Sequence, residues 1–139
     1  MHLWHLTEIK IPNGVKKIGI SAFAYCEALE IVELPDSVTE IDNSAFSYCS
    51  SLITVRLAEG LKSIGKSAFK GCFLLESITL PESLESIGDS AFEYCYSLTN
   101  IIIPEKVTSI GADTFYDCSS LESITIPGGV SSIGISAFN

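Results

Sequence analysis

Cysteine recurs every 23 residues along this chain of 139 residues, and the interval is held without an insertion or deletion. The cysteines are Cys26, Cys49, Cys72, Cys95 and Cys118. Phenylalanine keeps the same interval at Phe23, Phe46, Phe69, Phe92, Phe115 and Phe138. Isoleucine keeps it at Ile18, Ile41, Ile64, Ile87, Ile110 and Ile133. Three residue types that repeat together at one period indicate a repeat protein, in which small units stack into an array.

The repeat begins at Leu6 and divides the chain into five full copies and one partial copy. The full copies are 6–28, 29–51, 52–74, 75–97 and 98–120, and the partial copy is 121–139. Residues 1–5 form a degenerate N-terminal cap or tail, in which Leu3 stands where the period would place a cysteine. One copy buries too few apolar side chains to fold alone, so contacts between neighbouring copies must stabilise the array.

Each copy opens with a segment that predicts a short β-strand. In 75–81 apolar and polar residues alternate, which is the period of a strand with one buried face. We expect Ile78 to point inward, and Ser77 and Thr79 to point outward. Proline follows in most copies and ends the strand, because it has no N–H for the ladder. These prolines are Pro12, Pro35, Pro81, Pro104 and Pro127, with Ala58 in the third copy.

The rest of each copy predicts a second short extended piece, a turn and a short helical piece. The extended piece carries apolar residues such as Ile110 and ends at Gly111, where we expect a positive φ. Asp42 takes this glycine position once. Ser-Ala-Phe then follows, with the serine as a helix N-cap or turn residue, and places Phe92 and Cys95 on one inward face.

One whole copy reads Leu75-x-x-Ile78-x-Leu80-Pro81-x-x-Leu84-x-x-Ile87-Gly88-x-Ser90-Ala91-Phe92-x-x-Cys95. This pattern closely resembles the BspA-like class of leucine-rich repeats, and the resemblance extends from Leu6 over nearly the whole chain. The chain departs from the pattern at Asp42, Ala58, Asp113 and Thr114. The resemblance implies a curved, right-handed solenoid of short parallel strands, turns and short helical pieces. It also implies a cell-surface or secreted protein involved in adhesion or host interaction.

The charge and hydropathy of the chain argue against two classes of partner. The formal net charge is −9 and the eight basic residues are scattered, whereas a nucleic-acid backbone is bound by clustered lysine and arginine. The apolar runs are far shorter than the roughly 20 residues of a membrane-spanning helix, so no membrane insertion is expected. Residues 1–6 show no signal peptide.

Histidine occurs only at His2 and His5, which limits the chemistry available to the repeats. A lone His-x-x-His lacks the further ligands of a stable metal site, and a catalytic triad would need a histidine near the repeated core. The recurring serines are interpreted as turn or capping residues, and the cysteines as small core residues with a raised thiol pKa. We therefore predict no enzyme activity, no cofactor and no metal.

The outward positions of the strands are candidates for binding, because the inward positions are committed to packing. One line comprises Lys10, Glu33, Arg56, Thr79, Ile102 and Thr125. The parallel line comprises Glu8, Ile31, Thr54, Ser77, Asn100 and Ser123. Ile31 and Ile102 either mark a contact patch or are ordinary exposed aliphatics. The alternating charges of the first three copies either serve binding or form weak cross-strand ion pairs.

A second candidate surface is aromatic. Tyrosine precedes the cysteine at Tyr25, Tyr48 and Tyr94, with Phe73, Tyr96 and Tyr116 nearby. Such a side can supply anchor residues for a protein or a glycan, or its rings can simply cover the edge of the core.

An acidic line follows the strands at Asp36, Glu59, Glu82 and Glu105. It either attracts Ca²⁺ or a basic partner, or it is a solvated face.

These observations favour a non-catalytic binding module that recognises a protein or a glycan through the strand face or the tyrosine-bearing side. The alternative is a structural spacer or stalk within a larger cell-surface protein. An uncovered last strand around Ile124 and Ile126 would leave backbone N–H and C=O groups unpaired. Self-association through the open ends of the solenoid is therefore expected.

Overall fold

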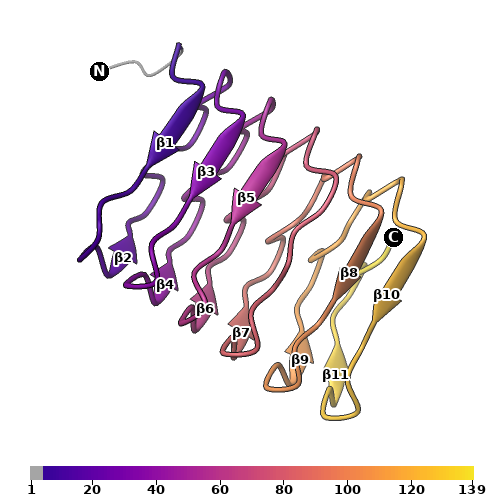
Figure 1. Cartoon of the computed structure of the whole chain (residues 1–139). Coiled ribbons are helices and arrows are strands. Elements are labelled where there is room, and N and C mark those ends of the chain that lie inside the picture. Colours follow the sequence, from indigo (N-terminus) through magenta and orange to yellow (C-terminus); the bar gives the residue numbers. More distant parts are fainter. Residues whose placement is uncertain (1–4) are drawn as a thin grey trace.

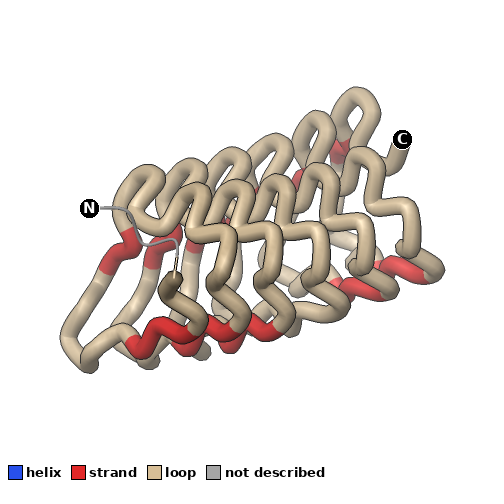
Figure 2. The backbone as a smooth tube through the Cα atoms, turned by 90° about the horizontal axis from the view of Figure 1, so that it is seen from above, coloured by secondary structure: helices blue, strands red, loops and turns tan. Residues whose placement is uncertain are grey.

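A computed structural model describes residues 5–139, which form one row of stacked coils (Figure 1). The five full repeats are called coils 1 to 5, and residues 121–139 are called coil 6. Figure 2 shows the coils as repeated loops that carry two rows of short strands. The predicted repeat solenoid with short parallel strands is thus confirmed. Within the described residues, no helix is long and apolar enough to cross a bilayer.

The first ladder consists of three-residue strands near the start of every coil except coil 4. They are β1 (Glu8–Lys10), β3 (Ile31–Glu33), β5 (Thr54–Arg56), β8 (Asn100–Ile102) and β10 (Ser123–Thr125). Pairing is parallel and each residue faces the residue 23 positions further on, as Ile9 faces Val32. The central residue of each strand packs toward the core and its two neighbours face outward, as the alternation predicts.

The second ladder consists of two-residue strands on the other side of the coils (Figure 1). They are β2 (Lys17–Ile18), β4 (Glu40–Ile41), β6 (Ser63–Ile64), β7 (Ser86–Ile87), β9 (Ser109–Ile110) and β11 (Ser132–Ile133). The recurring isoleucine is the last residue of each strand. It is buried in coils 1 to 5 and exposed at Ile133 in coil 6.

The expected helical pieces are absent from residues 5–139, and a third set of hydrogen bonds replaces them. The serine of Ser-Ala-Phe has a left-handed backbone, with φ of 53° at Ser21 and 58° at Ser90. This conformation turns alternate amides sideways toward the next coil. Phe23 N–H, for example, donates to the carbonyl oxygen of Ala45 at 2.8 Å. In a helix these amides would bond to carbonyl groups of the same segment. Here they bond to the next coil instead, so hydrogen bonding between coils replaces the local helix.

These inter-coil bonds, called the turn ladder, continue without a break from coil 1 to coil 6. Three amides of each coil donate to the next coil at every one of the five interfaces. In coil 4 they are the amides of Ser90, Phe92 and Tyr94. The turn ladder therefore ties together coils that the two strand ladders leave apart.

Both strand ladders are interrupted around coil 4. Residues 77–79 do not form the expected strand, and β5 and β8 have no partner in coil 4 (Figure 1). The second ladder stops between β7 and β9. Among the described residues, the amides of 76–80 donate no backbone hydrogen bond. The turn ladder is thus the main backbone connection between coils 4 and 5.

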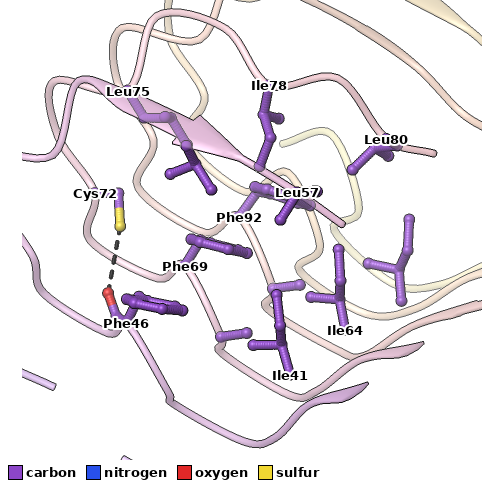
Figure 3. Close-up of a cluster of buried hydrophobic side chains, with 14 of the residues drawn as sticks. Ile41, Phe46, Leu57, Ile64, Phe69, Cys72, Leu75, Ile78, Leu80 and Phe92 are labelled. Atoms are coloured by element: carbon purple, nitrogen blue, oxygen red, sulfur yellow. Dashed lines mark hydrogen bonds between the residues drawn. The ribbon is translucent and has the colours of Figure 1, made fainter. Parts of the chain in front are cut away.

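The core is a column of repeated side chains. The phenylalanine rings stack from Phe23 to Phe138 with centroids 5.4 to 5.6 Å apart and planes within 14° of parallel. Figure 3 shows Phe46, Phe69 and Phe92 in this stack. Isoleucines of the second ladder and apolar residues of the first ladder close the core around the rings. Aromatic pairs stabilise beyond the area that they bury, so the stack contributes to every interface.

The recurring glycine is required for close approach rather than for a positive φ. Gly111 does not lie in the left-handed region, and the positive-φ glycines are Gly14 and Gly71. A Cβ on Gly88 would lie 2.7 Å from the carbonyl carbon of Gly65 and 2.8 Å from the Cα of Lys66. The prediction of a positive φ at Gly111 is therefore wrong. The constraint comes from the preceding coil, through its backbone at Gly88 and through the side chain of Asp89 at Gly111.

Candidate binding surface

The two outward lines of the first ladder lie on the surface. Lys10, Arg56, Thr79 and Thr125 are exposed, Glu33 is half-buried, and Ile102 is 65% exposed. Ile31 is exposed at 37%. The strand face thus carries charged side chains in coils 1 to 3 and only neutral side chains in coils 4 to 6.

The ion pairs considered for the strand face are not formed. In residues 5–139 the pairs are Lys17 with Glu40 and Asp42, Lys62 with Glu85, and Lys70 with Glu93. None of them involves Lys10, Glu33 or Arg56. Arg56 instead borders two shallow clefts, of about 210 Å³ beside Glu33 and about 320 Å³ beside Thr79. The larger cleft lies where the first ladder is interrupted.

The aromatic side forms one continuous chain of rings. This tyrosine stripe consists of Tyr25, Tyr48, Phe73, Tyr96, Tyr94 and Tyr116. Successive ring centroids lie 5.2 to 6.3 Å apart. Tyr25 is 59% exposed and Tyr96 is 39% exposed, while the other four rings are half-buried. The sequence placed Tyr25, Tyr48 and Tyr94 on this side, and the structure joins them through Phe73 and Tyr96.

Gly71 explains why the stripe changes line in coil 3. It stands at the register position of Tyr48 and Tyr94, with a φ of 74°. The ring of Tyr48 occupies the space that a side chain at Gly71 would need, since a Cβ there would clash with Cδ1 and Cε1 of the ring. The stripe therefore runs from Tyr48 to Phe73, two residues after Gly71, and returns to Tyr94 through Tyr96.

Three tyrosines of the stripe have a left-handed backbone. The φ angles are 60° at Tyr25, 58° at Tyr48 and 62° at Tyr94. Bulky residues rarely adopt this conformation, which costs roughly 1–2 kcal/mol for a residue with a Cβ. Glycine adopts this conformation without strain, and Gly71 shows that the fold accepts a glycine at this register position.

A lysine and a glutamate complete the stripe in coils 3 and 4. Lys70 Nζ lies 2.9 Å from Glu93 Oε2 and 5.4 Å from the centroid of the Tyr94 ring. The hydrogen bond that Lys70 donates to Glu93 raises the pKa of Lys70, and the negative charge of Glu93 raises the pKa of Tyr94. Sequence reasoning missed this pair. The sequence signal for this pair is two opposite charges 23 residues apart, each directly before the register position of Tyr48 and Tyr94.

The family follows from a comparison of the sequence with known repeats. The family model for the BspA type leucine-rich repeat region, with six copies, matches residues 1–121. The chain belongs to this family. BspA-type repeats account for the 23-residue spacing, the core positions and the absence of any insertion between coils.

Solved structures of bacterial leucine-rich repeat proteins have a similar fold. A leucine-rich cell surface protein from Faecalibacterium prausnitzii is 39% identical, with a TM-score of 0.82, over 86% of this chain and 31% of its own length. A leucine-rich repeat protein from Bacteroides ovatus is 36% identical, with a TM-score of 0.74, over 94% of this chain and 40% of its own. A leucine-rich repeat protein from T. pallidum is 28% identical, with a TM-score of 0.68, over 92% of this chain and 73% of its own length. No curated protein matches at a significant level.

Membership of the BspA-type family makes the chain a repeat-based module for protein interaction or for structure. The family and its fold are typically non-enzymatic. The chain spans about a third of the length of the first two solved structures that it matches.

The cysteines of the repeats are buried and free, in agreement with a packing role. Burial raises the pKa of every thiol, to about 12 at Cys49 and Cys118 and well above the usual range at Cys72 and Cys95. A thiolate is the reactive and metal-binding form, so these positions disfavour redox and metal chemistry.

Asp36, Glu59, Glu82 and Glu105 of the acidic line are exposed. In residues 5–139, no three acidic, cysteine or histidine side chains gather closely enough to hold a metal ion. His5 is exposed, and His2 lies outside the described residues.

Proposed function

We propose that this chain is the non-catalytic binding segment of a bacterial surface protein and that the tyrosine stripe contacts its ligand. The observation that supports this is the left-handed backbone of Tyr25, Tyr48 and Tyr94. A rigid, half-exposed aromatic ring is a frequent anchor at protein interfaces. Strained residues that persist where glycine would be easier are often retained for function.

The strand face is the second surface of this proposal. Ile102 is 65% exposed and lies between Thr79 and Thr125 in its line. A single exposed isoleucine is ordinary on a protein surface, so this face has weaker support than the stripe.

Location at the cell surface is part of the same proposal. The relative from Faecalibacterium prausnitzii is described as a cell surface protein and shares 39% of the aligned residues. A stripe that reaches the surface along coils 1 to 5 would be accessible to extracellular proteins and glycans.

A structural spacer is the alternative function. It is favoured by the phenylalanine stack and the turn ladder, which continue through all coils and would support a stiff rod. A spacer predicts no ligand for the isolated chain.

The test is a binding screen with surface-specific variants. The chain is immobilised and exposed to extracellular-matrix proteins and to arrays of neutral and acidic glycans. We expect a ligand whose affinity falls at least tenfold in the double variant Tyr25→Ala, Tyr96→Ala. The double variant Arg56→Ala, Ile102→Ser tests the strand face and should reduce the affinity less than the tyrosine variant does. Unchanged binding by the tyrosine variant would exclude the stripe, and the absence of any ligand would favour the spacer.

We further propose that the chain associates with a second copy through coil 6. Ile126, Ile133 and Phe138 are exposed there, and β10 is paired on one side only. Such an edge can pair with a strand of another chain. Sedimentation velocity should show a dimer that Ile133→Lys weakens, and a strict monomer at high concentration would contradict this proposal.

A further inference from the structure

We infer that the tyrosine stripe binds a basic, extended segment of a partner polypeptide. This inference rests on the proposed function and names the chemistry of the partner. It follows from the charges around the stripe, from a lysine already bound within it, and from the way the rings are stacked.

Carboxylates flank the stripe along its length. Glu27 stands at the register position that Phe73 and Tyr96 hold in later coils, and Asp117 stands at the register position of Tyr94. Glu30, Glu76 and Glu122 follow three residues further along the chain from the line of Glu27. All five carboxylates are exposed. No basic side chain in residues 5–139 forms an ion pair with any of them.

The basic residues lie mainly elsewhere on the coils. Lys10 and Arg56 are on the first ladder, and Lys17 and Lys62 pair with carboxylates at the second ladder. Lys70 is the one basic residue in contact with a ring of the described stripe, and Glu93 already neutralises it. The stripe is therefore an aromatic surface with an excess of negative charge, which complements a basic ligand.

Lys70 shows how the stripe accommodates a cation. Its ammonium group lies over the ring of Tyr94 and donates to the carboxylate of Glu93, which is buried. A cation that is held by a ring and a carboxylate together gains both cation–π and charge-assisted hydrogen-bond energy. Glu27 follows Tyr25 by two residues and Glu76 follows Phe73 by three; both carboxylates are exposed and form no ion pair with a lysine in residues 5–139.

The stacking of the rings favours a polypeptide over a glycan. Tyr25 and Tyr48 are stacked with planes 7° apart, and Phe73 and Tyr96 are stacked with planes 15° apart. One face of each ring is thus already covered by a neighbour. The exposed edges and hydroxyl groups suit the aliphatic stems and backbone groups of a peptide better than the flat face of a sugar.

The length of the stripe sets the length of the segment. It runs from coil 1 to coil 5, which is four inter-coil steps of about 4.8 Å, or roughly 19 Å. An extended chain rises about 3.3 Å per residue, so roughly six residues span the stripe.

The test uses three eight-residue peptides of one design, in which every second residue is valine or serine. The remaining positions are lysine and arginine in the basic peptide, glutamine in the neutral peptide and glutamate in the acidic peptide. Fluorescence anisotropy is measured at low and high NaCl. We expect the basic peptide alone to bind, with affinity that falls at least tenfold at high salt. Tyr25→Ala with Tyr96→Ala should also reduce the affinity at least tenfold.

Charge-reversal variants distinguish attraction of the peptide to the stripe from attraction to the net charge of the protein. Glu27→Lys with Glu30→Lys should abolish binding of the basic peptide. The matched pair Glu82→Lys with Glu105→Lys changes the net charge equally on the acidic line and should retain most of the affinity. Equal losses in both pairs would show nonspecific attraction and overturn the inference.

The proposed function fails by a different result. If the glutamine peptide or a glycan binds instead, and the tyrosine variant loses that ligand, the stripe is a binding surface but the basic partner is wrong. If the chain binds none of the peptides, matrix proteins or glycans, both the inference and the proposed function are wrong.

Discussion

The thiol of Cys72 donates a hydrogen bond to the carbonyl oxygen of Phe46 in the preceding coil, at 3.4 Å (Figure 3). Cys49, Cys95 and Cys118 make the equivalent bond at 3.2 to 3.3 Å. The repeated cysteine therefore contributes to the interface between coils as well as to the core. A small side chain with a weak donor suits a position where a carbonyl oxygen faces the packed interior.

The first prediction is that these thiols are inert in the folded protein. Cys72 and Cys95 are fully buried, so a reagent cannot reach their sulfur atoms. Their pKa is raised well above the usual range, so the reactive thiolate does not form at neutral pH. Iodoacetamide at pH 8 should leave both unmodified for hours and should label them within minutes in guanidinium chloride. Peptide mass spectrometry reads each site. Rapid native labelling of Cys72 would show that coils 3 and 4 open frequently.

The second prediction concerns stability at high pH. The pKa of Cys49 rises from 9.0 to about 12 on folding because burial disfavours the thiolate. The unfolded chain therefore releases this proton first, so the stabilisation is complete below pH 9 and is lost as the pH rises from 9 toward 12. The slope is about 1.4 kcal/mol per pH unit for this thiol. Urea unfolding of Cys49→Ser across this range should give a free energy that falls less steeply than wild type by that amount.

The third prediction concerns the recurring glycine. A methyl group on Gly88 would meet the backbone of Gly65 and Lys66, which cannot move aside without separating the coils. Gly88→Ala should destabilise the protein by about 1–3 kcal/mol in urea unfolding. Gly19→Ala is the matched control, because a Cβ at Gly19 would have no atom of the described residues within 4 Å apart from its chain neighbours. Equal effects at the two sites would contradict the close-approach explanation.

The fourth prediction concerns the interruption of the strand ladders. The amides of 77–79 have no acceptor among the described residues, whereas the amide of Phe92 donates to the carbonyl oxygen of Thr114 at 2.9 Å. Hydrogen exchange followed by NMR should therefore find Thr79 unprotected and Phe92 among the slowest amides. Val32, in the middle of β3, is buried like Ile78 but is paired with Ile9 on one side and Val55 on the other, and serves as the reference. Similar protection at Ile78 and Val32 would show that the ladder is continuous in solution.

The 23-residue period predicts the core because it assigns one environment to each register position. Phe46, Cys49 and Ile41 are buried in the coils where the sequence placed them. The helical piece after Ser90 could not be corrected from the sequence, because local propensity does not show that its amides bond to a coil 23 residues away. The interruption at 77–79 had no signal either, since this coil follows the repeat pattern closely.

The tyrosine stripe was predicted only in part. Tyr25, Tyr48 and Tyr94 share a line that the period reveals, and Gly71 is visible as a gap in that line. The detour through Phe73 depends on the rotamers of Tyr48 and Phe73, which spacing alone does not determine. The left-handed backbone at these tyrosines is a tertiary property as well, because the turn ladder imposes it.

The last prediction separates strain from binding at Tyr25. Tyr25→Ala removes the ring and keeps the left-handed strain, whereas Tyr25→Gly removes both. The glycine variant should therefore be more stable than the alanine variant by about 1 kcal/mol, although both lose the stacking on Tyr48 and both weaken ligand binding equally. At Tyr116, which has no positive φ, the order should reverse, because glycine gains more entropy on unfolding. Thermal unfolding of the four variants gives the two orders. If alanine is the more stable replacement at both sites, Tyr25 is not strained, and the argument that it is retained for binding loses its basis.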